Sequence, residues 1–340
     1  MRLWKSNCGG RALSWRGWLM VALAMLTASC AQLGDIFTPS APFMSGEWAE
    51  LLKEVRVYER RAGFVDTENF ADLTQDYDAT YFCGVASRLV LPYSYEDPAI
   101  AWTEPESEEE CRERGRGADA YYGAVEVLGE VGTPVTPSMI ANKLDRFLYL
   151  VIHEDCHDQF ELPAGIEEAL CDLITYKGMA EFTRAKFGTI SGENFAIRHY
   201  ADTQSKLARV NIAYYAQLET LYARYARGEI TAAALLWERA PIFRAAEKSL
   251  GWSEGNLNNV NLANDMTYSR HYPFMENVFD ALGRDLPRTI TFFRHIDKIK
   301  PDPDAVMKKL RLKPNSIELI RAYEAAVAET VRKALNDVEG

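Results

Sequence analysis

Two histidines and a glutamate have the spacing of a zinc-binding helix in the run His153-Glu154-Asp155-Cys156-His157. Side chains four residues apart lie on the same face of a helix, so His153 and His157 can bind one Zn²⁺. Glu154 follows the first histidine, where its carboxylate can accept a proton from a metal-bound water without being a ligand. The chain has only 5 histidines in 340 residues, so chance is a poor explanation of this spacing. The pattern predicts one catalytic Zn²⁺ with Glu154 as general base.

The third ligand is expected early in the next helix. A catalytic zinc site uses three protein ligands and leaves one position open for water. Pro163 and Gly165 interrupt the first helix, and a second apolar run of helical spacing follows them. Two helices joined by so short a turn pack antiparallel, which returns a carboxylate of the second helix to the level of His157. Glu167 and Glu168 are the two candidates.

Glu168 is the preferred ligand because Asp172 follows it one helical turn later. A carboxylate in that position can accept the free ring N–H of a ligand histidine and fix its tautomer. Glu167 remains the alternative ligand. The simpler interpretation of both glutamates is an acidic first turn, which is favourable beside the positive end of a helix dipole. We expect one of them to have only this second role.

These residues resemble a known clan of enzymes, the gluzincin peptidases, which includes thermolysin and the zinc aminopeptidases. The resemblance rests on His153, Glu154, His157, Glu168 and Asp172. More similar still is a bacterial family of predicted zinc aminopeptidases, often lipoproteins, whose members carry H-E-L-A-H and then F-N-E-S-F-A. Residues 166–171 occupy the second motif here, which puts Glu168 on the family glutamate and Glu167 where the family has asparagine.

Two further stretches extend the resemblance to about residues 110–296. Residues 117–125 look like the family's G-x-D strand region, and residues 258–268 look like its N-N-A-x-L segment ending in T-Y, with Tyr268 in register. The resemblance implies Tyr268 as a donor to the tetrahedral intermediate, with nearby His271 as a second candidate. The alternative for Tyr268 is a buried phenol that holds a helix turn.

The resemblance implies a zinc-dependent peptidase of aminopeptidase type that acts on peptide substrates. Asp155 and Cys156 depart from the family's apolar-small pair, so substrate preference is not carried over. They also keep an alternative open: a zinc-stabilised but inactive envelope lipoprotein that binds a partner protein. Glu154 favours the enzyme, because a purely structural zinc site needs no base.

The first 29 residues have the pattern of a secretory signal. Basic residues precede the apolar run 18–26, and small residues precede Cys30. This end resembles a bacterial lipobox, in which the cysteine becomes the lipidated first residue; simple cleavage and an uncleaved anchor are the alternatives. We therefore expect a membrane anchor on Cys30, a lipidated tether over residues 30–45, and a location on the periplasmic side of the cell envelope, at the outer membrane.

Charge argues against nucleic acid as a partner. The whole chain has a formal net charge of −11, and removal of residues 1–29 would take away 4 basic and no acidic residues. A protein this acidic is repelled by phosphate backbones. No stretch after the signal segment is long and apolar enough to span a bilayer.

Four cysteines remain beyond the signal and lipidation segments, an even number in an oxidising compartment: Cys83, Cys111, Cys156 and Cys171. Cys156 follows His153 by three residues, and Cys171 follows Glu168 by three. The related family has alanine at both places, as expected where two helices come close. A disulfide between Cys156 and Cys171 is one interpretation, and two small buried residues are the other. The pairing of Cys83 and Cys111 stays open.

The chain as a whole predicts an α+β fold that is mainly helical, with a gluzincin-like zinc peptidase core and a small sheet beside the zinc helix. One metallopeptidase-like domain is expected over residues 46–340, with the zinc core at about 110–190 and a helical remainder at 191–340. Residues 121–131 are the best strand, and residues 92–116 are expected to form a solvated loop and then a short helix. Further helices are expected at 47–61, 193–227, 231–250, 273–281 and 316–335.

Overall fold

The computed structural model describes residues 45–71, 79–125, 132, 134–141 and 143–339. The expected signal segment, Cys30 and the expected tether up to residue 44 lie outside the described residues. So do residues 126–131 of the expected strand. Within the described ranges, no helix is both long enough and apolar enough to cross a membrane.

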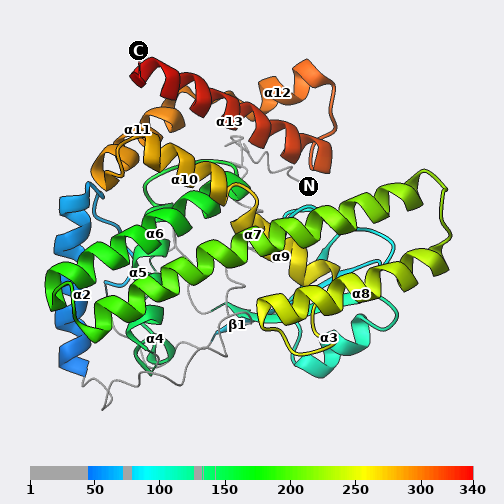
Figure 1. The fold of residues 1–340 in the computed structure, drawn as a ribbon, viewed down its shortest axis with the longest axis horizontal. Coiled ribbons are helices and arrows are strands. Elements are labelled where there is room, and N and C mark those ends of the chain that lie inside the picture. The colour runs from blue at the N-terminus through cyan, green and yellow to red at the C-terminus, as the bar shows by residue number, and fades with distance from the viewer. Residues whose placement is uncertain (1–44, 72–78, 126–131, 133, 142, 340) are drawn as a thin grey trace, which may run out of the picture.

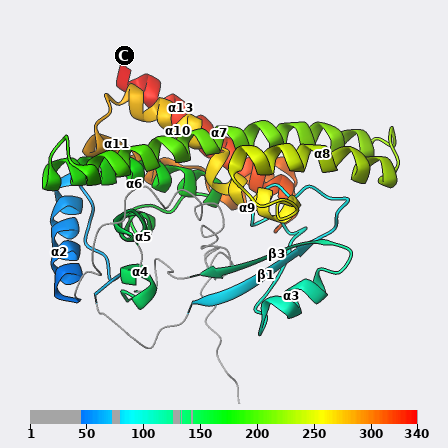
Figure 2. The ribbon, with the colours of Figure 1, turned by 60° about the horizontal axis from the view of Figure 1, so that its bottom comes forward.

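Helices make up most of the described chain, and a small sheet lies to one side of them (Figure 1, Figure 2). The predicted class, α+β and mainly helical, is therefore confirmed. The helices are α2 (Ser45–Ala62), α3 (Glu108–Arg114), α4 (Pro137–Ala141), α5 (Leu144–His157), α6 (Ala164–Phe187), α7 (Gly192–Ala226), α8 (Ala232–Leu250), α9 (Asn259–Ser269), α10 (Tyr272–Ala281), α11 (Leu286–Ile299), α12 (Pro303–Leu310) and α13 (Ile317–Glu339). The strands are β1 (Thr80–Ala86), β2 (Ala101–Thr103) and β3 (Asp119–Val125).

The sheet is antiparallel with the strand order β2-β1-β3. In the central strand, Cys83 is opposite Tyr122 of β3. Phe82 and Tyr121 belong to a buried apolar cluster that also contains Val260 of α9. The sheet thus packs on α9, and α9 packs in turn on α6.

The prediction for residues 92–116 is wrong in part. The short helix exists as α3, but the segment before it contains strand β2 and is not a solvated loop. Tyr95 is 1% exposed and Ile100 is 5% exposed. Prolines and acidic residues make this segment polar on average, while its few apolar side chains point inward and are buried. Cys111 of α3 forms a disulfide with Cys83 of β1, and their Cα atoms lie 5.5 Å apart.

Helices α5 and α6 pack on each other at the centre of the main core (Figure 2). Five apolar side chains of α5 at helical spacing are buried: Leu144, Phe147, Leu148, Val151 and Ile152. Helix α5 ends at His157, and Pro163 is the N-cap residue of α6. Gly165 therefore lies in the first turn of α6, and the prediction that it interrupts the chain between the helices is wrong.

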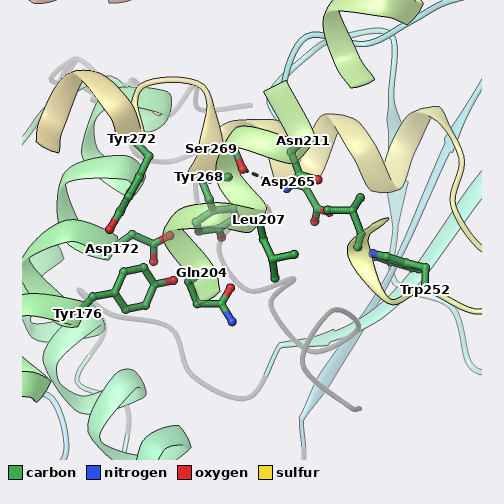
Figure 3. Close-up of a pocket in the computed structure, with 12 residues that line it drawn as sticks. Asp172, Tyr176, Gln204, Leu207, Asn211, Trp252, Asp265, Tyr268, Ser269 and Tyr272 are labelled. Atoms are coloured by element: carbon green, nitrogen blue, oxygen red, sulfur yellow. Dashed lines mark hydrogen bonds between the residues drawn. The ribbon is translucent and has the colours of Figure 1, made fainter. Parts of the chain in front are cut away.

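The other predicted helices are confirmed to within a few residues as α2, α7, α8, α10 and α13. Helix α7 is 35 residues long and runs beside α6, α8 and α9 (Figure 1). A pocket of about 50 Å³ lies among α6, α7, α9 and α10, with Asp172 at one end and Trp252 at the other (Figure 3).

Candidate metal centre

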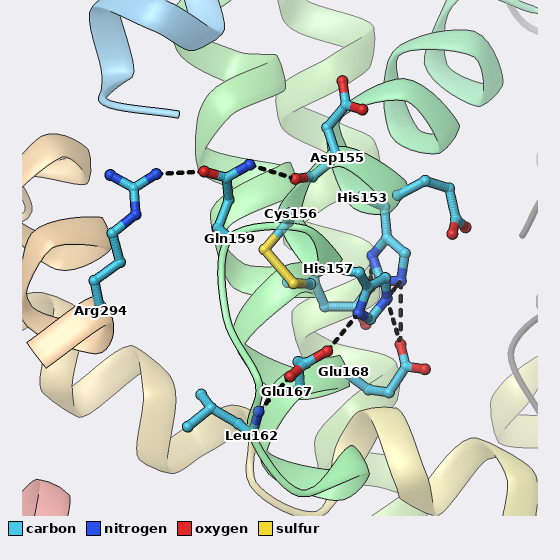
Figure 4. Close-up of a disulfide and its surroundings, with 12 residues drawn as sticks. His153, Asp155, Cys156, His157, Gln159, Leu162, Glu167, Glu168 and Arg294 are labelled. Carbon is cyan, nitrogen blue, oxygen red and sulfur yellow. Dashed lines mark hydrogen bonds and ion pairs between the residues drawn. A yellow bond between two sulfur atoms is a disulfide. The ribbon is translucent and has the colours of Figure 1, made fainter. Parts of the chain in front are cut away.

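Three buried side chains from two helices meet at one point (Figure 4). His153 and His157 come from α5 and Glu168 comes from α6, and each is 1% exposed. The Nε2 atoms of the two histidines are 3.2 Å apart. Oε2 of Glu168 lies 3.1 Å from Nε2 of His153 and 3.4 Å from Nε2 of His157. The structure thus brings together the three side chains that the sequence predicts as metal ligands.

These separations fit a tetrahedral metal ion. Ligand atoms about 2.0–2.1 Å from a tetrahedral Zn²⁺ lie roughly 3.3–3.4 Å from one another. The outer ring nitrogens face carboxylates: Nδ1 of His157 is 3.0 Å from Oε1 of Glu167, and Nδ1 of His153 is 3.5 Å from Oδ1 of Asp172. Only the contact of His157 meets the distance and angle of a hydrogen bond, and an N–H on its Nδ1 leaves the Nε2 lone pair directed at Glu168. Three electron-rich atoms this close could hold a metal ion between them.

The charge balance of the centre supports the same conclusion. Burial by itself raises the pKa of Glu168, but His157 and His153 outweigh it and lower the pKa to about 2. Burial likewise lowers the pKa of His157, yet Glu168 and Glu167 hold it well above the usual value. The carboxylates thus favour positive charge at this point, which a divalent cation would supply.

Each carboxylate in the first turns of α6 has a separate contact. Oε2 of Glu167 accepts a hydrogen bond of 2.6 Å from the backbone N–H of Leu162, while its Oε1 faces His157. The expectation that one glutamate only favours the helix dipole is therefore wrong for Glu167, which fixes the orientation of a ligand. Asp172 lies beside His153 and accepts a 2.7 Å hydrogen bond from Tyr149; burial raises the pKa of Asp172 to about 6.

The two unusual residues inside the histidine motif point away from the metal ligands. Asp155 is fully buried, pairs with Arg56 of α2 and accepts a 2.6 Å hydrogen bond from Thr67. Cys156 forms a disulfide with Cys171 of α6, and their Cα atoms lie 5.6 Å apart. Figure 4 shows this disulfide between the two helices, beside the ligand cluster. Both residues attach α5 to its neighbours.

Tyr268 of α9 lies next to the centre. Its ring centroid is 6.3 Å from that of His153, and its buried hydroxyl has no hydrogen-bond partner within the described part of the chain. Burial, followed by the charges of Glu168, Asp172 and Glu154, raises the pKa of Tyr268 well above its usual value. The hydroxyl therefore stays protonated and can donate. Glu154 is 3% exposed, and its charge acts on this same hydroxyl.

His271 has a different neighbour. Its Nε2 lies 2.9 Å from Oε2 of Glu324 on α13. His271 is the N-cap residue of α10 and thus contacts α13, whereas the ring of Tyr268 lies beside that of His153.

Sequence reasoning missed Tyr95 and Glu96. The hydroxyl of Tyr95 donates a 3.1 Å hydrogen bond to Oε1 of Glu168, the carboxylate oxygen that faces away from the histidines. Burial, and then the charges of Glu324, Glu168 and Glu167, raises the pKa of Glu96 to about 8. Both residues lie in the segment expected to be a solvated loop, where no periodic pattern marked them as buried.

One protein-family model matches the chain, over residues 102–309, and its description is "Putative aminopeptidase". The match covers the ligand helices, α9 with Tyr268 and more than half of the sequence. No curated protein and no solved structure matches. The chain belongs to this aminopeptidase family.

Proposed function

We propose that the protein is a zinc aminopeptidase, with His153, His157 and Glu168 as the ligands of one Zn²⁺. The observation that carries the proposal is the triangle of ligand atoms, 3.1, 3.2 and 3.4 Å on its sides, with Glu154 next to it in sequence. Family membership supports the peptidase class. When bound, Zn²⁺ supplies Lewis-acid chemistry: it lowers the pKa of water to about 7 and polarises a carbonyl group.

The protein side chains would then perform the proton transfers. Glu154 accepts a proton from the attacking water and delivers it to the leaving amine. Tyr268 donates a hydrogen bond to the oxygen of the scissile carbonyl as negative charge develops on it. Glu167 and Asp172 keep the protons of the ligand imidazoles on Nδ1, which leaves both Nε2 atoms free to bind metal.

The alternative, an inactive zinc-stabilised lipoprotein, depended on the two unusual residues of the motif. Asp155 and Cys156 attach α5 to α2 and α6, and neither is directed at the ligand triangle. Asp155 and Cys156 therefore have a structural role, and the proposed ligands and Glu154 remain available for catalysis. Glu154, which a structural zinc site does not need, supports the enzyme.

Hydrolysis of aminoacyl-fluorogenic substrates by zinc-reconstituted protein tests the proposal. Substrates with a free amino terminus should be cleaved, and the same substrates with a blocked amino terminus should not. Glu154→Gln should keep its zinc but lose about 10²–10⁴-fold in kcat, because only the proton acceptor is removed. Tyr268→Phe should lose about 10²–10³-fold, as expected for one oxyanion donor. Near wild-type turnover by Glu154→Gln, or no cleavage of any substrate, would contradict the proposal.

We also propose that a lipid on Cys30 anchors the mature protein to the periplasmic side of the cell envelope. The lipobox-like sequence before Cys30 supports this. Cys30→Ala should abolish metabolic labelling with a fatty acid and release the protein from the membrane fraction. Unchanged fractionation of the variant would argue against the anchor.

A further inference from the structure

The pocket described above adjoins the metal centre. Asp172 and Tyr268 belong to its wall, and both also contact or approach His153. One water needs roughly 10–15 Å³ of such space, so a volume of about 50 Å³ has room for roughly three to five water-sized groups. Asp172 and Tyr268 thus belong both to the wall of this pocket and to the surroundings of His153.

The far part of the pocket contains a carboxylate without a cation. Asp265 of α9 lines this part, and Asn264 is its hydrogen-bond partner. Across the described ranges, no Lys, Arg or His forms an ion pair with Asp265. The side chain of Asp265 is partly exposed, and the cost of desolvating its charge raises its pKa to about 7. A ligand that brings a positive charge would remove this cost.

A second acceptor lies in the same part of the pocket. Nδ2 of Asn211 donates a 3.1 Å hydrogen bond to Ser269, whereas its Oδ1 has no hydrogen-bond partner among the residues that the structure describes, although Asn211 is only 7% exposed. Figure 3 shows Asn211 and Asp265 at the end toward Trp252, with Asp172 at the opposite end. A buried acceptor without a donor is costly, so this end is suited to a ligand with N–H groups.

We propose that this pocket is the subsite for the side chain of the substrate's amino-terminal residue, and that it selects a basic side chain, lysine above all. The inference rests on the proposed aminopeptidase function. The methylene groups of lysine would pack on Leu207 and Leu250, and its ammonium would meet Asp265 and Asn211. Charge-assisted hydrogen bonds of this kind are about twice as strong as neutral ones.

Binding of L-lysinamide and L-norleucinamide to the full chain tests the subsite without turnover. The two probes differ only in the terminal ammonium. By calorimetry on zinc-loaded Glu154→Gln protein, lysinamide should bind at least about tenfold more tightly, and Asp265→Asn added to this protein should remove the difference. Asp304→Asn, which removes an exposed carboxylate of α12, is the matched control and should leave the difference intact. Equal binding of both probes, or binding of neither, overturns the proposal.

Leu207→Lys tests the same subsite independently, should Asp265→Asn fail to fold. Leu207→Lys places an ammonium at a partly exposed position of the wall, where it competes with the ligand, and should also abolish the preference for lysinamide. A preference unchanged in folded Leu207→Lys would contradict the assignment.

Kinetics separates this inference from the proposed function. The ratio of kcat/KM for lysyl over norleucyl substrates should fall at least about tenfold in Asp265→Asn at unchanged zinc content, and not in Asp304→Asn. Efficient cleavage of norleucyl substrates with no preference for lysyl ones would overturn the subsite and leave the peptidase standing. Absence of all cleavage, with selective binding of lysinamide, would overturn the peptidase and leave the pocket's specificity standing.

Discussion

At the scale of single residues, the two ring nitrogens of each histidine at the centre have different neighbours. The Nδ1 atoms face Glu167 and Asp172, at 3.0 and 3.5 Å, and the Nε2 atoms face Glu168. Carboxylates on the outer nitrogens fix the tautomer and raise the basicity of the inner ones. The ligand carboxylate is itself held by Tyr95. Metal affinity should therefore depend on residues that never contact the metal.

Substitution of Glu167 and of Glu168 should show which glutamate binds the metal and which one orients His157. Glu168→Ala removes a ligand and should abolish stoichiometric zinc binding. Glu167→Gln should lower zinc affinity about 10- to 100-fold, because a neutral amide has one acceptor oxygen for two donors, the His157 ring N–H and the Leu162 backbone N–H. Competition with a chromogenic chelator measures both.

Glu193→Gln is the control for the helix dipole, since Glu193 is an exposed acid in the first turn of α7. It should leave zinc affinity unchanged. A larger loss of zinc from Glu167→Gln than from Glu168→Ala would reverse the two assignments.

The sequence predicted which side chains meet at the centre better than it predicted their surroundings. His153, His157 and Glu168 are related by helical spacing and one short turn, so local geometry is enough to bring them together. Tyr95 reaches Glu168 from 73 residues away. No local pattern encodes a contact of that kind.

At the scale of elements, α5 and α6 must keep a fixed distance for the triangle to exist. Cys156 and Cys171 join them within the main core, and the ion pair of Asp155 with Arg56 attaches α5 to α2. Long periodic helices such as α7 were predictable because their apolar faces repeat over many turns. Strand β2, with 3 residues, is too short to show any period.

Removal of the Cys156–Cys171 disulfide should weaken both the fold and the site. For a closed loop of 15 residues, loop-closure entropy corresponds to about 3 kcal/mol. The double variant Cys156→Ala/Cys171→Ala should lose about that much free energy of unfolding in urea, measured without metal, and should bind zinc more weakly.

The Cys83–Cys111 disulfide provides the comparison. It closes 28 residues and joins the sheet to α3, away from the ligands. Cys83→Ala/Cys111→Ala should also be less stable, but its zinc affinity should equal that of the native protein. Equal losses of zinc affinity in both double variants would show that the α5–α6 bridge has no special role.

The α2–α5 contact also predicts a pH dependence of stability. Burial raises the pKa of Glu59 from 4.5 to about 8, although Arg56 lies 3.3 Å away. Between these two values the folded protein keeps a proton that the unfolded chain releases. Glu59 therefore lowers the free energy of unfolding progressively as pH rises through this window.

Glu59→Gln should remove this slope. The stability of the variant relative to native protein should increase between about pH 5 and pH 8, as measured by urea unfolding at each pH. Glu50→Gln, an exposed acid on the same helix, should show no such trend. A constant difference across the window would mean that Glu59 is already ionised in the folded state.

At the scale of the whole molecule, helix α13 packs against α6, the helix that carries Glu168. Glu324 of α13 is 1% exposed and accepts a 2.7 Å hydrogen bond from Tyr93. The same oxygen lies 2.9 Å from Nε2 of His271. These contacts join residues 231 and 53 positions apart in the chain. Glu324 also lies against Gly165, in the first turn of the helix that supplies Glu168.

A methyl group at Gly165 should test how rigidly this contact holds α6. A Cβ there would lie 2.4 Å from Oε1 of Glu324, and Tyr93 and His271 oppose movement of that side chain. Gly165→Ala should therefore cost about 1–3 kcal/mol of stability, as overpacking in a core does, and should weaken zinc binding. Gly192→Ala is the control: nothing lies within 4 Å of its Cβ in the first turn of α7, so no loss is expected. In a Glu324→Ala background the clash is absent, and Gly165→Ala should then cost less by at least about 0.5 kcal/mol in a double-mutant cycle. Equal costs in the two backgrounds would place the constraint on α6 elsewhere than at the C-terminal helix.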